Sequence, residues 1–202
     1  MAFEIRDARD EDGPALVGII GRVFTEYPGC VLDVDGEMPE LRAIASSFRR
    51  QGGRFWVATR RADPAGAEGS PEKPGSASSA LGDPSRAGDA RIGERIVGCV
   101  GLSPAVPSSP PSPGGVELRK LYVDRRERGA GIGRALCECV EREARLRGAA
   151  FVELWTDTRF EAAHRLYAAR GYVTSWRGET RITRELHDKS ASIEYHYRLA
   201  LT

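Results

Sequence analysis

The stretch Arg128-Gly129-Ala130-Gly131-Ile132-Gly133 joins residues 117–123, which have the composition of a β-strand, to a helical pattern of apolar residues that begins near Ile132. Its three glycines lack a Cβ atom, so a ligand can approach the backbone closely. The first N–H groups of a helix have no partner within the helix, and together with the helix dipole they favour a bound anion. The stretch therefore predicts a phosphate-binding turn.

Two common phosphate-binding motifs do not match this stretch. A dinucleotide-binding loop requires the spacing G-x-G-x-x-G, but the last glycine is replaced by Arg134 when counting starts at Gly129 and by Leu136 when it starts at Gly131. A nucleoside-triphosphate loop requires Gly-Lys followed by Ser or Thr, and no lysine of the chain follows a glycine. The remaining pattern, Arg-x-x-Gly-x-Gly, resembles the acetyl-coenzyme A (acetyl-CoA) pyrophosphate loop of the GNAT superfamily of N-acetyltransferases.

A second segment, residues 163–172, strengthens this resemblance. It contains Ala163, then Tyr167 four residues later, and then Gly171 followed by an aromatic residue, which is similar to the second signature of the family. The pattern departs from the family at Phe160, where many members carry an asparagine that contacts the pantetheine arm.

The resemblance spans residues 5–173 and implies a mixed α/β fold. Its central sheet would be twisted and mostly antiparallel, with one splayed pair of parallel strands, and about four helices would flank it. Hydrophobic periodicity predicts helices at residues 15–24, 40–50 and 132–147 and strands at 3–6, 55–59, 95–102, 117–123 and 150–155. At the end of the chain, strands are expected at 172–177 and 193–199, with a connection at 178–190.

Two segments interrupt this single expected domain, residues 1–202. Residues 62–90 are dominated by Gly, Pro, Ser, Ala and charged residues, so they cannot bury enough apolar surface to offset the entropy of ordering them. We expect a disordered insertion there. Residues 103–115 contain five prolines, which predicts an extended Pro/Ser-rich loop.

The resemblance also implies that acetyl-CoA is the acyl donor. The glycine stretch would hold its pyrophosphate, and backbone groups of the central strand would contact its pantetheine arm. The expected cofactor-binding residues are Leu121, Tyr122, Val123, Arg128, Gly129, Ala130, Gly131, Ile132, Gly133, Arg134 and His164. Arg134 and His164 have an alternative interpretation, as helix-surface side chains without a role.

Tyr167 matches the position of the general acid of the family. A thiol has a pKa near 8.5 and a phenol near 10, so a tyrosine can protonate a departing thiolate at a cost of about 2 kcal/mol. The alternative is packing on one helix face. A proton acceptor is also needed, because a primary amine with a pKa near 10.4 is almost fully protonated at pH 7. Glu117 is the candidate, unless it only faces solvent; Glu153 and Asp157 are alternatives.

Aromatic and polar residues near the expected strand ends are candidates for binding the acceptor. Ligands of open α/β sheets collect at the C-terminal ends of the strands, where Trp155 and Asp157 lie. Tyr27 lies in a turn-rich segment between two expected helices. Asp157 either holds an ammonium group or caps the following helix.

The composition argues against several other classes of protein. Charged residues make up 29% of the chain but balance to +1, so we expect neither nucleic acid nor a membrane as a partner. Residues 1–14 lack the pattern of a signal peptide, and we expect a cytoplasmic protein. The four cysteines lack zinc-site spacing, so no metal is expected. Cys139 is predicted to lie in the core and Cys137 to be exposed.

The sequence therefore predicts an N-acetyltransferase that moves acetyl from acetyl-CoA to a primary amine by direct attack in a ternary complex. The acceptor is either a small-molecule amine or a protein amino group, and no motif selects between them. A non-catalytic acyl-CoA-binding or sensing module on the same fold is the alternative, and succinyl- or propionyl-CoA is an alternative donor. An exposed strand edge near the C-terminus would permit a homodimer.

Overall fold

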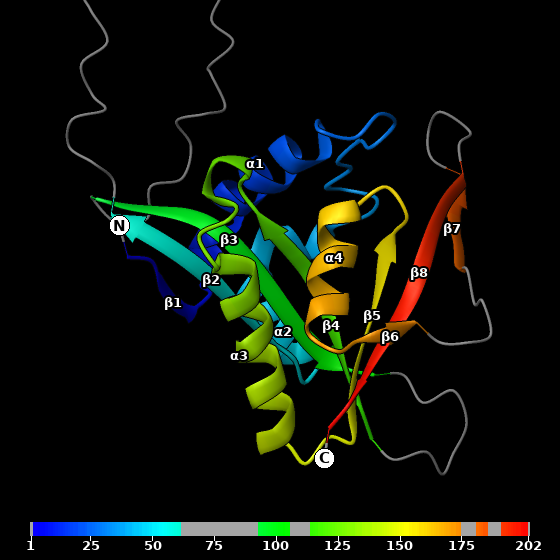
Figure 1. Ribbon diagram of the computed structural model, residues 1–202. Helices are drawn as coiled ribbons and strands as arrows, with labels where there is room; N and C mark the ends of the chain where they lie inside the picture. Colours follow the sequence, from blue (N-terminus) through cyan, green and yellow to red (C-terminus); the bar gives the residue numbers. More distant parts are fainter. Residues whose placement is uncertain (1, 62–92, 106–113, 175–180, 186–190, 202) are drawn as a thin grey trace, which may run out of the picture.

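The computed structural model describes residues 2–61, 93–105, 114–174, 181–185 and 191–201. Its strands form one mixed sheet in the order β1-β2-β3-β4-β5-β8-β6, with β7 paired to β8 (Figure 1). The strands are β1 Glu4–Asp7, β2 Arg54–Arg61, β3 Glu94–Pro104, β4 Val116–Val123, β5 Phe151–Asp157, β6 Val173–Thr174, β7 Arg181–Glu185 and β8 Ala191–Ala200. The helices are α1 Gly13–Phe24, α2 Ile44–Arg50, α3 Ile132–Leu146 and α4 Glu161–Ala169, with short 3-10 turns η1 Asp10–Asp12, η2 Pro39–Ala43 and η5 Arg125–Glu127.

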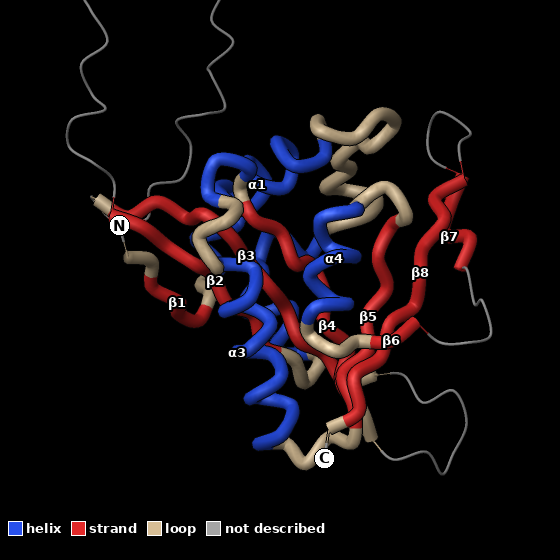
Figure 2. The backbone as a smooth tube through the Cα atoms, viewed as in Figure 1, coloured by secondary structure: helices blue, strands red, loops and turns tan. Residues whose placement is uncertain are grey.

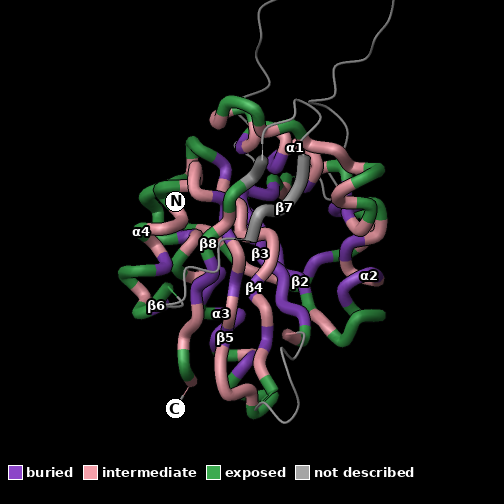
Figure 3. Tube along the Cα trace, turned by 90° about the vertical axis from the view of Figure 1, so that its right-hand side faces the viewer, coloured by how far each residue is buried: buried purple, intermediate pink, exposed green. Residues whose placement is uncertain are grey.

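Helices cover both faces of the sheet (Figure 2). Side chains alternate between the two faces along a strand. On β2, Trp56 and Ala58 lie in the core beneath α3 and α4, whereas Phe55 and Val57 lie in the core beneath α1 and α2. Buried residues accordingly concentrate along the central strands, whereas exposed residues lie mainly on helix surfaces and loops (Figure 3). The mixed α/β fold predicted from the sequence is confirmed.

The parallel pair of strands opens along its length. β4 and β5 pair only at Val116 with Val152 and at Glu117 with Glu153, whereas β5 pairs with β8 from Phe151 to Asp157. β4 also contains a β-bulge, because its register against β3 shifts between Cys99 and Gly101. The strand pair therefore leaves an opening beyond Glu117, on the side where α4 packs (Figure 1).

Three expectations about the elements were wrong. The predicted helix 40–50 is divided into η2 and α2, because Ala43 has an extended φ of −148° that interrupts the helix. The predicted connection 178–190 contains the strand β7. In the predicted loop 103–115, Ser103 and Pro104 extend β3 and pair with Glu117 and Val116.

Two further expectations concern single segments. Cys137, predicted to be exposed, is fully buried, because α3 is packed by the sheet on one side and by the α4 region on the other. Cys139 lies in the same core, as predicted. The expected insertion 62–90 and residues 106–113 of the Pro/Ser-rich loop lie outside the described residues.

Candidate functional site

The glycine stretch forms a turn that opens onto the N-terminus of α3. Gly129 and Gly131 have φ values of 82° and 83°, in the left-handed region that favours glycine, and Gly131 is the N-cap residue of α3. A Cβ atom at either position would meet nothing within 4 Å. Gly133 serves packing instead, because a Cβ atom there would lie 3.3 Å from the Leu166 side chain. The turn therefore offers accessible backbone to an anion.

This turn lines a cavity of about 410 Å³, here called the loop cavity. Its lining includes most of the predicted cofactor-binding residues: Leu121, Tyr122, Val123, Arg128, Gly129, Gly131, Ile132, Gly133 and Arg134. Tyr27, predicted to bind the acceptor, also lines it and packs on Phe160 with 4.7 Å between ring centroids. Ala130 is exposed at the tip of the turn.

The two arginines beside the glycines are already paired. Arg128 donates to both carboxylate oxygens of Glu26, at 2.7 and 2.8 Å, and its Nε donates to the Val123 carbonyl at 3.2 Å. Arg128 thus ties the turn to the end of β4 and to the residues after α1. Arg134 is exposed and pairs with Glu138 at 3.0 Å, one helical turn away.

A second cavity of about 440 Å³, here called the sheet cavity, adjoins the first. The two share the lining residues Leu121, Tyr122, Phe160 and Ala163, from β4, the turn before α4 and α4 itself. The predicted residues Glu117, Trp155, Asp157 and Tyr167 all line the sheet cavity. The fold therefore gathers the predicted catalytic and acceptor residues, except Tyr27, beside the predicted coenzyme site.

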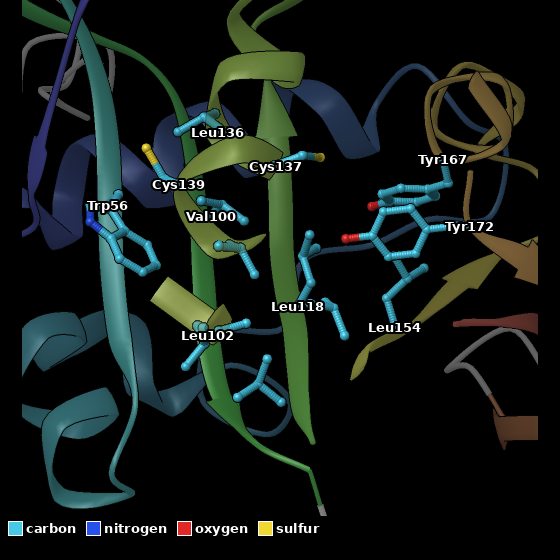
Figure 4. Packing of buried hydrophobic residues seen from close by; sticks show 14 of the residues in the cluster. Trp56, Val100, Leu102, Leu118, Leu136, Cys137, Cys139, Leu154, Tyr167 and Tyr172 are labelled. Atoms are coloured by element: carbon cyan, nitrogen blue, oxygen red, sulfur yellow. The ribbon is translucent and has the colours of Figure 1, made fainter. Parts of the chain in front are cut away.

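Tyr167 lies almost fully buried where α4 meets the opening between β4 and β5. Only 4% of its surface is exposed, and its ring lies 5.6 Å from that of Tyr172 and 5.9 Å from that of Tyr197. Figure 4 shows the rings of Tyr167 and Tyr172 side by side above Leu154. Burial raises the pKa of Tyr167 well above 10, so its hydroxyl stays protonated at neutral pH.

The two candidate glutamates differ in their surroundings. Glu117 and Glu153 occupy paired positions on β4 and β5. Glu153 accepts a hydrogen bond from Arg198 at 2.8 Å and lies 3.3 Å from Nε2 of His196. Only Glu117 of the two lines the sheet cavity. The position of Glu117 therefore suits contact with a ligand better than that of Glu153.

Asp157 is engaged by its own loop. Its carboxylate accepts hydrogen bonds from the Arg159 side chain at 2.9 and 2.7 Å and from the Arg159 amide at 2.8 Å. The N-cap residue of α4 is Phe160, which has no side-chain cap hydrogen bond, so Asp157 does not cap the helix. Its charge is largely compensated by Arg159.

His164 connects α4 to β5 and β8. Nε2 lies 3.0 Å from the Asp157 carbonyl oxygen and Nδ1 lies 2.9 Å from the Tyr197 hydroxyl. Because a carbonyl oxygen only accepts, Nε2 carries a proton, and in the neutral ring Nδ1 accepts from Tyr197. His164 is not among the residues that line either cavity.

Sequence reasoning missed a cluster on the other wall of the sheet cavity. Lys120 has a φ of 54°, and its Nζ lies 2.9 Å from Glu40 of η2. Arg119 lies 3.8 Å from the same carboxylate oxygen. The bulge in β4 creates this cluster, and only the rarity of lysine in the chain could have drawn attention to it.

Neither a metal site nor a membrane-spanning helix occurs in the described residues. No group of His, Cys, Asp and Glu within them could hold a metal ion. In the same part of the chain, no helix is both long enough and apolar enough to cross a membrane.

Comparison with known proteins places this geometry in a family. The sequence profile of the Acetyltransferase (GNAT) family matches residues 59–172, more than half of the chain. No curated protein sequence matches the chain.

Solved structures share the fold at low sequence identity. An acetyltransferase of the GNAT family from Staphylococcus aureus Mu50 is 18% identical, with 100% of both chains covered and a TM-score of 0.66. YncA from Salmonella typhimurium, solved with its cofactor acetyl-CoA, is 15% identical over 100% of this chain and 95% of its own, with a TM-score of 0.63. Ribosomal-protein-alanine N-acetyltransferase from Brucella melitensis is 19% identical over 98% and 99% of the two chains, with a TM-score of 0.62. By its profile match over residues 59–172, and in agreement with its fold, the chain belongs to the GNAT family of acetyltransferases.

Proposed function

We propose that the protein transfers an acetyl group from acetyl-CoA to a primary amine while both are bound. The observation that carries this proposal is the junction of the two cavities, which share residues of β4 and α4. The glycine turn at one end suits a pyrophosphate, and Tyr167 and Glu117 lie in the neighbouring sheet cavity. A donor in the loop cavity and an amine in the sheet cavity would meet at this junction.

The residues of the loop cavity would hold the donor. Backbone N–H groups around Gly129 and Gly131 and the N-terminus of α3 would bind the pyrophosphate. Backbone groups of residues 121–123, beside the opening between β4 and β5, would contact the pantetheine arm. Acetyl-CoA supplies an activated thioester. The amine nitrogen forms a bond to the carbonyl carbon as the carbon–sulfur bond breaks.

Two protons must move during this transfer. A primary amine with a pKa near 10.4 is about 0.04% neutral at pH 7, which costs roughly 4.6 kcal/mol. Glu117 would accept the amine proton, directly or through water. Tyr167 would donate a proton to the departing sulfur. Burial raises the pKa of Tyr167, which keeps the hydroxyl protonated and able to donate.

A thiol-release assay across a panel of amines tests the proposal. Acetyl-CoA should release free thiol with at least one amine class, and mass spectrometry should find the acetylated amine. Succinyl-CoA and propionyl-CoA are assayed in the same way, because the proposal also specifies acetyl as the transferred acyl group. Acetyl-CoA binding without thiol release from any amine would contradict the proposal and favour a sensing module.

A further inference from the structure

One wall of the sheet cavity carries two cationic side chains, Arg119 and Lys120. Lys120 and Arg119 both face Glu40, with 2.9 Å from Lys120 Nζ and 3.8 Å from Arg119 Nη2 to the same oxygen, Oε1. The Arg119 guanidinium also lies over the Phe48 ring, 5.7 Å from its centroid. Two cations thus share the single carboxylate of Glu40.

The bulge in β4 explains why both cations reach the same wall. Cys99 pairs with Tyr122 and Gly101 with Arg119, so Lys120 and Leu121 together oppose Val100. In a regular strand the side chains of Arg119 and Lys120 would point to opposite faces of the sheet. The bulge instead lets both approach Glu40. Lys120 adopts a left-handed backbone conformation that residues other than glycine rarely keep, and such conformations cluster at binding sites.

Glu40 does not fully compensate the buried ammonium group. Only 9% of the Lys120 side chain is exposed. Burial lowers the pKa of Lys120, and the hydrogen bond and charge of Glu40 do not restore it. A second anion beside Lys120 would therefore stabilise the charged form.

The rest of the cavity has the opposite character. Among the described residues, four carboxylates line it: Glu37 before η2, Glu117 on β4, Glu194 on β8, and Asp157, which pairs with Arg159. The cavity thus has cationic and anionic parts, and an amine is itself a cation before it reacts. A ligand that carries both an ammonium and a carboxylate group complements both parts.

We propose that the acceptor is an amino acid, an amine that also carries a carboxylate, and that Lys120 and Arg119 bind this carboxylate. The proposal rests on the proposed function of the sheet cavity. A cavity of about 440 Å³ is of the size that holds a small molecule. The amine nitrogen still forms the bond to the acetyl group, so Lys120 and Arg119 determine specificity and take no part in the proton transfers.

Matched pairs of amino acids and their carboxamides test this proposal, because only the amino acid carries the carboxylate. The amine of the carboxamide is also less basic, so the preference is judged by how it changes from the parent to each variant. The kcat/KM should favour the amino acid by about 10- to 100-fold, the range expected for hydrogen bonds to a charged group. Arg119→Met and Lys120→Met should remove most of this preference by raising KM for the amino acid, with little change for the carboxamide. Arg165→Met, on the exposed side of α4, is the control and should keep the preference.

Two additions keep the test decisive. Arg119 does not have the left-handed backbone conformation of Lys120, so Arg119→Met still tests the proposal if Lys120→Met fails to fold. Titration of the N-acetylated amino acid and its carboxamide into the protein measures the same preference without turnover. Equal dissociation constants for these two products, or a preference that survives in the Arg119 variant, would overturn the inference. If no amine releases thiol but the protein still binds the N-acetylated amino acid more tightly than its carboxamide, the result counts only against the proposed function.

Discussion

Arg170 and Glu141 form a buried, bidentate ion pair that joins the end of α4 to α3. The Nε–Oε1 and Nη2–Oε2 distances are 2.9 and 2.7 Å, and 12% and 7% of the two side chains are exposed. The Tyr172 hydroxyl donates to the same carboxylate at 3.3 Å. This pair lies beside the contact between Tyr167 and Tyr172, so it positions the segment that carries the proposed general acid.

Glu141→Gln should therefore destabilise the fold. The change leaves the buried Arg170 charge only its longer contact with Glu138, at 3.3 Å. Loss of one member of a buried pair typically costs about 3 kcal/mol. The control is Glu161→Gln, which breaks an exposed pair with Arg165 and should cost less than about 0.5 kcal/mol. Denaturant unfolding measures both changes in the free energy of unfolding. Equal effects of the two substitutions would show that the buried pair does not hold α4.

The glycine turn should be required for donor binding. A ligand at about 100 times its dissociation constant stabilises the folded state by roughly 2.7 kcal/mol, which raises the melting temperature. Gly131→Val should abolish this rise with acetyl-CoA, because it places a branched side chain where the backbone must contact the pyrophosphate.

Gly148→Val is the matched control for this substitution. Gly148 also has a positive φ, 68°, and open space around it, but it follows the other end of α3. Both variants should lose similar intrinsic stability from backbone strain, and only Gly148→Val should keep the response to acetyl-CoA. If acetyl-CoA raises the melting temperature of Gly131→Val as much as that of the parent, the pyrophosphate binds elsewhere.

Asp124 should make the turn sensitive to acid. Burial alone would raise the pKa of Asp124, but hydrogen bonds from the Arg126 amide at 3.1 Å and from Arg22 at 3.0 Å outweigh it and hold the pKa below 3.8. Because the folded pKa is lowered, this stabilisation is present above the unfolded pKa and is lost as pH falls through the folded pKa.

Asp124→Asn tests this dependence directly. At pH 7 the substitution should cost about 2 kcal/mol, and the difference from the parent should shrink as the pH falls below about 4. Denaturant unfolding from pH 3 to 7 gives the comparison. A difference that is the same at every pH would mean that the charge of Asp124 contributes nothing.

Local patterns in the sequence were enough to predict most strands, most helices and the glycine turn. Apolar residues recur with the period of a strand in residues 117–123 and with the period of a helix in residues 132–147. This periodicity is visible in each segment by itself, so it predicts the secondary structure without knowledge of the fold. Tyr167 and Glu117 were candidates because of the family resemblance, and the structure places both in the lining of the sheet cavity. The roles of these residues, the expected homodimer and the expected absence of nucleic acid and membrane partners stay predictions.

Features that depend on contacts between distant residues could not be predicted in this way. The cluster of Lys120 and Glu40 exists because the register of β3 against β4 shifts, and register is not encoded by either strand alone. Cys137 lies off the apolar stripe of α3 but is buried by the α4 region. The pairing of Arg128 with Glu26 joins residues 102 positions apart in the chain.

Single-turnover acetyl transfer by Tyr167→Phe tests the central claim most directly. The substitution removes only the hydroxyl, so acetyl-CoA affinity should hardly change, whereas loss of a positioned general acid should lower the rate by about 10²- to 10⁴-fold. Tyr172→Phe is the control, because its hydroxyl contacts Glu141 and its ring packs beside Tyr167. Enzyme in excess over acetyl-CoA, with saturating amine, isolates the transfer step. The predicted result is a reduced rate of acetyl transfer in Tyr167→Phe and a parental rate in Tyr172→Phe. An unchanged rate in Tyr167→Phe would contradict the account and leave Tyr167 a packing residue.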